Sequence, residues 1–243
     1  MKIRLDNALV ERGLVGSRSQ AESYIKLGKV TVNGVAVEKA GAKVGAEDVI
    51  KLDVGEQYVS RAGHKLAGVS QDLYLNFKDS VVLDVGSSTG GFTDYVLKSG
   101  ASMVYAVDVG TDQMHPSLRG DGRIELHEKT DIRSFKRPDR AIDYVVIDVS
   151  FISLRDILPH IVSELISPTT TIIAMVKPQF EADRSQVNKG VVKNKAVRRK
   201  ILDDFEGWVS QSLVILDKRD SSVAGAKGNV ERFYKLRLPK SRR

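Results

Sequence analysis

A glycine-rich turn after an apolar segment limits the possible folds of this chain more than any other feature. The segment Val81 to Val85 is apolar except for Asp84, and glycines follow at positions 86, 90 and 91. Such a run suits a buried strand, and the glycines allow a tight turn and a close approach of a ligand to the backbone. Together they predict the first strand, turn and helix of a doubly wound α/β domain, in which ligands bind beyond the carboxyl ends of the strands.

The turn also restricts the class of ligand. It is not a G-x-G-x-x-G sequence, and no Gly-Lys-Ser or Gly-Lys-Thr follows it. Asp108 ends the next apolar run, where an acidic residue can bind both hydroxyls of a ribose. An Asp-x-Gly turn with such an acid favours an adenosine ligand without phosphate, such as S-adenosylmethionine. An ordinary turn in an α/β domain is the plain alternative, and a nicotinamide dinucleotide is the second candidate ligand.

The chain after this turn alternates short apolar runs with helical patterns. Apolar spacing predicts helices over residues 153–166 and 196–213. Further strands are predicted over residues 103–109, 142–149, 171–176 and 235–238. Strands separated by helices indicate a mostly parallel sheet that is covered on both faces.

The first fifty residues follow a different pattern. Apolar spacing predicts a helix over residues 5–14, and Ser17 followed by Gln20 is typical of a capping box that starts a second helix. Asn33-Gly34 between two alternating runs predicts a β-hairpin, and a last strand is expected over residues 48–52. A polar connector follows. The expected domains are therefore a small α+β domain at residues 1–55 and an α/β domain at residues 56–243.

Composition excludes several kinds of site and favours an anionic partner. The net charge is +7, which suits binding to nucleic acid, although a merely basic protein would also carry it. The chain has no cysteine, so disulfides, thiolate metal sites and cysteine nucleophiles are excluded, and its four histidines show no metal-ligand spacing. No metal is expected. The first residues lack the apolar region of a signal peptide and no run reaches the ~20 apolar residues of a membrane span, so we expect a cytoplasmic protein without stable membrane association.

Four charged residues are predicted to lie at strand ends or helix starts of the larger domain. They are Lys65, Asp148, Lys177 and Glu231. Lys177 directly follows a buried apolar run, where a charge is costly unless it is paired, and Asp148 is a suitable partner. A set of purely structural ion pairs is the alternative interpretation.

These residues resemble a known family. The larger domain resembles ribose 2′-O-methyltransferases of the FtsJ type, which use a Lys-Asp-Lys-Glu tetrad, and the whole chain is similar to the TlyA family, also called haemolysin A. The resemblance implies a Rossmann-like fold with a mixed, mostly parallel seven-stranded sheet. It also implies S-adenosylmethionine as cofactor, and methylation of cytidine ribose 2′-hydroxyls in ribosomal RNA or ribosomal subunits. The stretches that carry it are 58–61 with Lys65, 84–94, 106–110, 148–153, 176–181 and 228–231.

The resemblance assigns roles to individual residues. Lys65, Asp148, Lys177 and Glu231 form the catalytic tetrad, and Lys177 is the candidate that orients the ribose hydroxyl and accepts its proton. At Asp131 the family pattern would have asparagine, although a carboxylate can still accept a hydrogen bond from the adenine amino group. The expected cofactor-binding residues are Asp84, Gly86, Ser87, Ser88, Thr89, Gly90, Gly91, Phe92, Asp108, Val109, Asp131 and Asp148.

The front domain resembles the small RNA-binding module of ribosomal protein S4. Its cations suit contacts with phosphates, which position RNA without reading its sequence. A solvated helix face that also carries acidic residues is the alternative. The expected RNA-binding residues are Arg4, Arg18, Lys26 and Lys29 in this domain and Arg61 in the next.

Two further features invite a functional interpretation beside a plain one. The run Lys189 to Lys200 is the densest in cations, and either flanks the substrate entrance or forms a solvated helix start. Phe151 and Phe180 stand beside the tetrad, where they either stack on an exposed nucleotide or pack in the core.

Three other functions compete with the RNA methyltransferase. A non-catalytic RNA-binding protein of the same fold is disfavoured because all four tetrad positions hold competent residues. A haemolysin or other membrane-active protein predicts a signal, a span or a lytic amphipathic segment, and the sequence has none. A nicotinamide-dependent oxidoreductase ranks last. The target nucleotide and the oligomeric state are not readable from the sequence.

Overall fold

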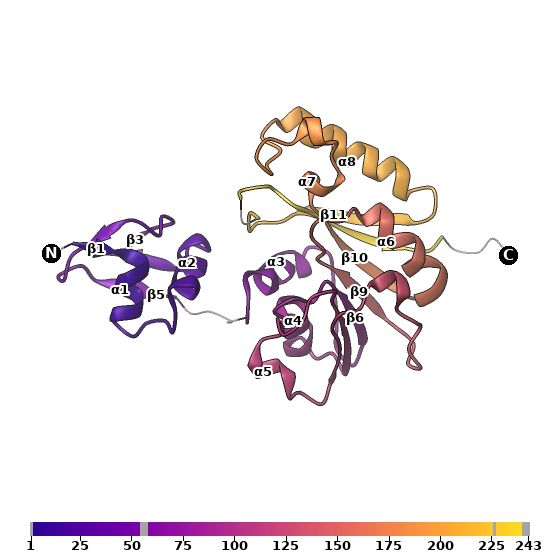
Figure 1. Cartoon of the computed structure of the whole chain (residues 1–243), viewed down its shortest axis with the longest axis horizontal. Coiled ribbons are helices and arrows are strands. Elements are labelled where there is room, and N and C mark those ends of the chain that lie inside the picture. The colour runs from indigo at the N-terminus through magenta and orange to yellow at the C-terminus, as the bar shows by residue number, and fades with distance from the viewer. Residues whose placement is uncertain (1, 54–57, 226, 240–243) are drawn as a thin grey trace. The chain divides into compact units, whose positions relative to one another are not determined.

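The computed structural model describes residues 2–53, 58–225 and 227–239, and divides into two compact units, Met1–Gln57 and Tyr58–Arg243 (Figure 1). The expected domain boundary between residues 55 and 56 lies outside the described residues. Each unit is built around a hydrophobic core of its own.

The N-terminal unit is a small α+β domain, as expected. Helices α1 (Leu5–Glu11) and α2 (Arg18–Lys26) cover a three-stranded antiparallel sheet of order β3-β2-β5, and β1 pairs with β4. The core of the unit includes Leu5, Leu9, Ile25 and Val30. The strands are β1 (Ile3–Arg4), β2 (Val30–Val32), β3 (Val35–Ala36), β4 (Lys43–Val44) and β5 (Ile50–Leu52).

Local signals in this unit act largely as predicted. The Ser17 hydroxyl caps α2 by accepting a hydrogen bond from the Gln20 amide at 3.2 Å. The Gln20 side chain accepts from the amide of Gly16 rather than from that of Ser17, so the capping box is shifted by one residue. Asn33 and Gly34 both have positive φ, and the β2–β3 hairpin predicted around them is confirmed.

The second unit contains the predicted seven-stranded sheet, in the order β11-β12-β10-β9-β6-β7-β8. Only β12 runs antiparallel to its neighbours, so the sheet is mixed and mostly parallel. The strands are β6 (Val81–Val85), β7 (Met103–Val107), β8 (Ile124–His127), β9 (Tyr144–Ile147), β10 (Thr171–Val176), β11 (Val214–Asp220) and β12 (Arg232–Arg237).

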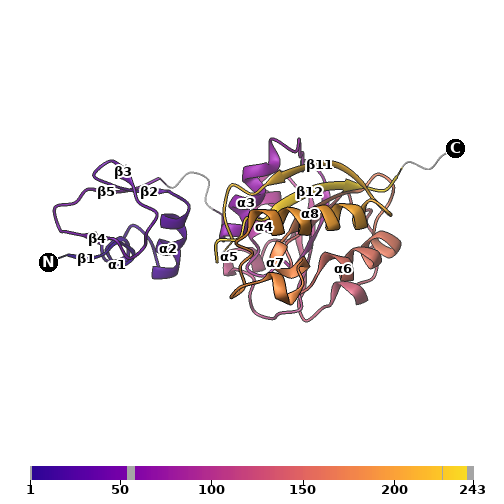
Figure 2. The ribbon, with the colours of Figure 1, turned by 90° about the horizontal axis from the view of Figure 1, so that it is seen from above.

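Helices cover both faces of this sheet. Alternate residues of β6 belong to opposite cores: Val82 packs with α3 and α4, and Leu83 packs with α6 and α8. Figure 2 shows α8 lying along the β11–β12 end of the sheet. The helices are α3 (Arg61–Ser70), α4 (Gly91–Lys98), α5 (Pro116–Arg119), α6 (Leu154–His160), which continues as a π-helical turn, α7 (Pro178–Glu181) and α8 (Lys195–Val209). The fold class predicted from the sequence is confirmed.

The sequence patterns did not reveal the two edge strands, β8 and β11. Both are short or partly polar, and β11 ends in the four charged residues Asp217 to Asp220 and has an irregular register near Ile215. Edge strands expose one side to solvent and often carry charges. The polar pattern of these segments therefore does not distinguish a strand from a loop until the neighbouring strand is in place.

Candidate active site

The glycine turn lies where β6 ends and brings three chain segments together. Gly86 has a φ of 81°, and a Cβ there would lie 2.7 Å from the carbonyl oxygen of Asp148 at the end of β9. Gly91 starts α4, and a Cβ there would overlap Ser60 and Ala62 beside the start of α3. Both positions therefore require glycine, because a side chain would push apart the strands and helices that form the site.

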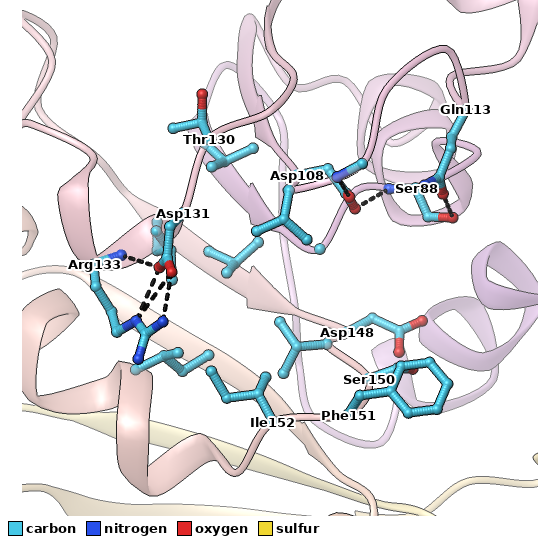
Figure 3. Close-up of a pocket in the computed structure, with 18 residues that line it drawn as sticks. Ser88, Asp108, Gln113, Thr130, Asp131, Arg133, Asp148, Ser150, Phe151 and Ile152 are labelled. Carbon is cyan, nitrogen blue, oxygen red and sulfur yellow. Dashed lines mark hydrogen bonds and ion pairs between the residues drawn. The ribbon is translucent and has the colours of Figure 1, made fainter.

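Two adjoining hollows open at this edge of the sheet. The larger is a cavity of about 600 Å³ that Asp108, Asp131 and Asp148 line, and Figure 3 shows its labelled residues. The smaller, of about 150 Å³, is lined by the turn residues Ser87, Ser88 and Thr89 together with Ser60 and Lys177. Gly86, Ser88, Asp148 and Ser150 line both hollows. A group that passes from a ligand in one hollow to a ligand in the other would therefore cross beside Asp148.

Asp108 is held by two backbone amides. Its Oδ2 accepts a hydrogen bond from the Ser88 amide at 2.8 Å, and its Oδ1 accepts one from the Gly110 amide at 2.7 Å (Figure 3). Each carboxylate oxygen has a second lone pair, so Asp108 can still accept from a pair of adjacent hydroxyls. The turn after β6 and the end of β7 thus fix an acceptor in the large cavity, at the place predicted for a ribose.

Asp84 lies beneath the turn and is fully buried. Its Oδ2 accepts a hydrogen bond from the Thr93 hydroxyl at 2.6 Å, and its Oδ1 has no hydrogen-bond partner among the described residues. Burial raises the pKa of Asp84 to about 7, against the hydrogen bonds from Thr93, and the charges of Asp148 and Asp108 raise it further. The buried Ser87 hydroxyl on the same turn also lacks a partner in the described chain. Unsatisfied buried polar groups are uncommon in native structures, and two of them at one turn call for an explanation such as a bound water, ion or ligand.

Asp131 lies at the far side of the large cavity, and its carboxylate already has a charged partner that the sequence patterns did not identify. Arg133 forms an ion pair with it at 2.6 Å, and the Arg133 amide also donates to its side chain (Figure 3). These hydrogen bonds from Arg133 lower the pKa of the Asp131 carboxyl. Gln113 is a further lining residue that no sequence pattern identified, and Ser150 and Ile152 belong to the 148–153 stretch but had no predicted role.

Most of the predicted cofactor residues line one or both of the hollows, and two line neither. Asp84 and Gly90 line neither hollow: Asp84 is beneath the turn, and Gly90 lies against Met114 and Leu118. The large cavity is lined by Gly86, Ser88, Asp108, Val109, Asp131 and Asp148, and the small one by Gly86, Ser87, Ser88, Thr89, Gly91, Phe92 and Asp148.

The four tetrad residues form two ion pairs at the same edge. The Lys177 ammonium lies 2.6 Å from Asp148 Oδ1 and donates a hydrogen bond to the Ser150 hydroxyl at 2.8 Å. The Lys65 ammonium donates to Glu231 at 2.5 Å, and both of these side chains are buried. Because Val176 pairs with Arg232 in the β10–β12 ladder, Lys177 and Glu231 occupy adjacent strand ends one residue further along. The Lys177–Asp148 pair lines the small hollow described above, so a ligand bound there can reach it.

Of the two roles expected for Phe151, packing in the core is wrong. It is 91% exposed, has a φ of 67° and follows Ser150 in the loop after β9, so it is not a core residue. Its ring centroid lies 5.2 Å from that of Phe180, which is partly buried after β10. The two loops that carry Asp148 and Lys177 are therefore joined by an aromatic contact at the cavity.

The predicted RNA-binding cations lie in two different settings. Arg4 and Arg18 both bond the buried carboxylate of Asp6, at 2.7 and 3.1 Å, and the hydrogen bonds from Arg4 contribute most to lowering the pKa of Asp6 to about 2. Lys26 is exposed, and Lys29 lies 3.8 Å from Asp53. Arg61 belongs to the second unit and donates to the Ala224 carbonyl at 2.6 Å, which ties α3 to the loop before β12.

Two other kinds of feature are absent from the described residues. No group of three or more potential ligands that could hold a metal ion is found there. Nor does any helix in the described ranges have the length and apolar character needed to span a membrane.

Comparison with known proteins identifies the family that each unit matches. Residues 58–238 match the FtsJ-like methyltransferase family, and residues 3–50 match the S4 domain. Hemolysin A of Brachyspira hyodysenteriae is 38% identical over 234 residues, which are 94% of this chain and 97% of that protein. The 16S/23S rRNA (cytidine-2′-O)-methyltransferase TlyA of Mycobacterium tuberculosis is 37% identical over 253 residues, covering 99% of this chain and 92% of that protein.

A solved structure agrees with these matches. A candidate hemolysin from Streptococcus thermophilus is 35% identical and has a TM-score of 0.75. The match covers 99% of this chain and 90% of that one. The matched regions contain the glycine turn, both hollows and all four tetrad residues. The chain belongs to the FtsJ-like methyltransferase family.

Proposed function

We propose that this protein transfers the methyl group of S-adenosylmethionine to ribose 2′-hydroxyls of cytidines in ribosomal RNA. The observation that carries the proposal is the Lys177–Asp148 pair, which lies where the large cavity meets the small hollow. The similar M. tuberculosis protein is named for cytidine-2′-O methylation of 16S and 23S rRNA, which supports this substrate. The S4 domain at residues 3–50 supports an RNA partner.

The residues of the large cavity and of the glycine turn beside it fit S-adenosylmethionine. Asp108 presents a fixed carboxylate to the ribose hydroxyls, and Asp84 and Ser87 supply unsatisfied buried polar atoms under the turn. Asp84, Asp108 and Asp148 together favour a ligand with positive charge, such as a sulfonium with an amino group. Asp131 would accept a hydrogen bond from the adenine amino group while its carboxylate also pairs with Arg133. When bound, the cofactor supplies an electrophilic methyl group.

Lys177 would act on the acceptor ribose. Its ammonium group is fixed by Asp148 and Ser150, so it is oriented before any RNA binds. From this position it orients the 2′-oxygen for in-line attack, and such positioning supplies much of the acceleration of a two-substrate reaction. To receive the hydroxyl proton, Lys177 first loses one of its own protons to solvent, so that the neutral amine is the base. Lys65 and Glu231 support the site from the adjacent strand end, because their buried pair holds α3 against the start of β12.

The test is methyl transfer to unmodified ribosomal subunits, with methyl-labelled S-adenosylmethionine, for the wild type and for Lys177→Ala. Lys136→Ala, at an exposed lysine outside both hollows, is the control. Label on RNA that maps to ribose, is present with the control and is lost with Lys177→Ala supports the proposal. Full activity of Lys177→Ala, or label that maps to a base, would overturn it. Cofactor binding by calorimetry shows whether a variant has lost the reaction or only the cofactor.

A further inference from the structure

Two segments that are bonded to the residues just before Glu231, or that contain them, are rich in exposed lysines. Five exposed lysines come from two separate segments of the chain, four from the connection into α8 and its first turns and one from the loop before β12. They are Lys189, Lys193, Lys195, Lys200 and Lys227, and we refer to them as the basic rim. The basic rim includes most of the cation-rich run for which the sequence left two interpretations open.

A buried side chain fixes this segment to the loop before Glu231. Asn229 is 4% exposed, its Oδ1 accepts a hydrogen bond from the Val192 amide at 3.0 Å, and its Nδ2 donates to the Gly190 carbonyl at 2.9 Å. Arg198 in α8 donates to the Val230 carbonyl at 3.0 Å. The three bonds hold the basic segment against the two residues that precede Glu231. The position of the basic rim relative to the tetrad is therefore set by the fold.

A tight turn fixes the backbone at one end of the basic rim. Asn188 and Val191 bond each other through both backbone groups, and Lys189 and Gly190 between them have φ values of 50° and 81°. Lysine is uncommon in this left-handed region, which asparagine and glycine favour. The ammonium of Lys227 lies against this turn, 3.0 Å from where a Cβ of Gly190 would be. Two cations that are distant in the sequence are thus held at one turn.

The stability of the folded chain does not explain this arrangement. Gathering like charges is unfavourable, and Lys195 starts α8, where a cation opposes the helix dipole. The neighbouring arginines have partners, because Arg198 pairs with Asp220 and Arg199 with Asp203. No salt bridge to a basic-rim lysine is found among the described residues. The rim is therefore available to an anionic partner.

We propose that the basic rim is a second RNA-docking surface, on the catalytic unit itself, that binds the phosphate backbone of folded RNA. The proposal rests on the proposed function and adds the place at which the substrate is gripped. Lysines bind phosphates as point charges and do not read bases, so the surface recognises backbone shape rather than sequence. Because Asn229 and Arg198 fix the rim to the strand of Glu231, phosphates bound there hold the target ribose in register with Lys177.

The test compares two triple variants of the full chain that remove the same charge. One is Lys189→Gln, Lys193→Gln and Lys195→Gln. The matched control also removes three exposed cations, and its substitutions are Lys78→Gln, Lys136→Gln and Arg140→Gln. Lys78 precedes β6, the other two precede β9, and none of the three lines either hollow. Binding to unmodified ribosomal subunits is measured over a range of salt concentrations, together with kcat and KM for subunits and Kd for S-adenosylmethionine.

The rim variant should bind subunits at least about tenfold more weakly than the control at low salt. The magnitude of the slope of log K against log salt should also fall by about two to three, since each lost phosphate contact reduces that slope by about 0.7–0.9. Kd for the cofactor should not change. Equal binding and equal salt slopes for the two triple variants would overturn the proposal. Failure of the proposed function shows differently, as wild-type protein that transfers no label to RNA, and the salt slopes still test the rim in that case. Equal thermal midpoints exclude unfolding as the cause.

Discussion

Replacing Asp84 with asparagine should stabilise the ligand-free protein and weaken its binding of S-adenosylmethionine. Asp84 is fully buried, its Oδ1 is unsatisfied in the described chain, and its neighbours Asp148 and Asp108 repel its negative charge. An asparagine has nearly the same shape and keeps an oxygen that accepts from Thr93. The substitution therefore removes the cost of a buried charge and leaves the surrounding contacts in place.

The size of the effect follows from the pKa. The pKa of Asp84 rises from 3.8 in the unfolded chain to about 7 in the folded one, which is a difference of about three units or ~4 kcal/mol. A raised carboxyl pKa means that the folded state binds the proton more tightly. The wild type is therefore most stable below the unfolded pKa and loses stability as the pH rises from about 4 to about 7. Asp84→Asn lacks this loss, so its advantage should be near zero at pH 4 and approach ~4 kcal/mol at pH 8.

Urea unfolding at a series of pH values measures this difference, with the exposed Asp72→Asn as the control for loss of one carboxylate. Calorimetry at pH 8 should show weaker binding of the cofactor by Asp84→Asn, because the carboxylate that complements a cationic ligand is gone. A variant that is less stable than the wild type at pH 8, or an advantage that does not grow with pH, would refute the reasoning. Tighter cofactor binding by the variant would refute the assignment of Asp84 to the cofactor site.

Three further predictions concern other parts of the chain. Asp6→Asn should cost about 2 kcal/mol in urea unfolding at neutral pH, because the pKa of Asp6 is lowered to about 2, and the wild-type advantage should disappear as the pH falls from about 4 to about 2. Gly86→Ala should cost about 1–3 kcal/mol, because of its positive φ and the Asp148 carbonyl 2.7 Å from the new Cβ, and cofactor titration should show weaker binding; unchanged affinity and stability would contradict this. Glu181→Ala should lower kcat more than it raises KM for the cofactor. The buried Glu181 carboxylate accepts hydrogen bonds from the Ser153 hydroxyl and the Leu154 amide at 2.6 and 2.8 Å, and so joins α7, which follows Lys177, to the start of α6. Exposed Glu164→Ala is its control in the same kinetic assay, and an equal effect of both variants would count against a positioning role.

Local sequence signals determined most of the elements near the site. The apolar run that forms β6, the glycine turn and the runs for β7, β9 and β10 each carry their own pattern, because buried parallel strands need continuous apolar side chains. The Asn33-Gly34 hairpin and the Ser17 cap are likewise local, because turn and cap geometry depend on one or two residues. From these elements the positions of Asp108, Asp148 and Lys177 at the carboxyl edge of the sheet could be predicted.

Tertiary structure alone decided how those residues are shared among partners. Lys65 and Glu231 are 166 positions apart, and only the antiparallel insertion of β12 beside β10 brings Glu231 to the edge where α3 presents Lys65. The bond from Arg61 to the Ala224 carbonyl, between residues 163 positions apart, also had no signal in the sequence. Residue type and spacing specify which backbone shapes and which burial are favourable. Which charged groups then meet depends on contacts between segments distant in the chain, and these exist only once the sheet has formed.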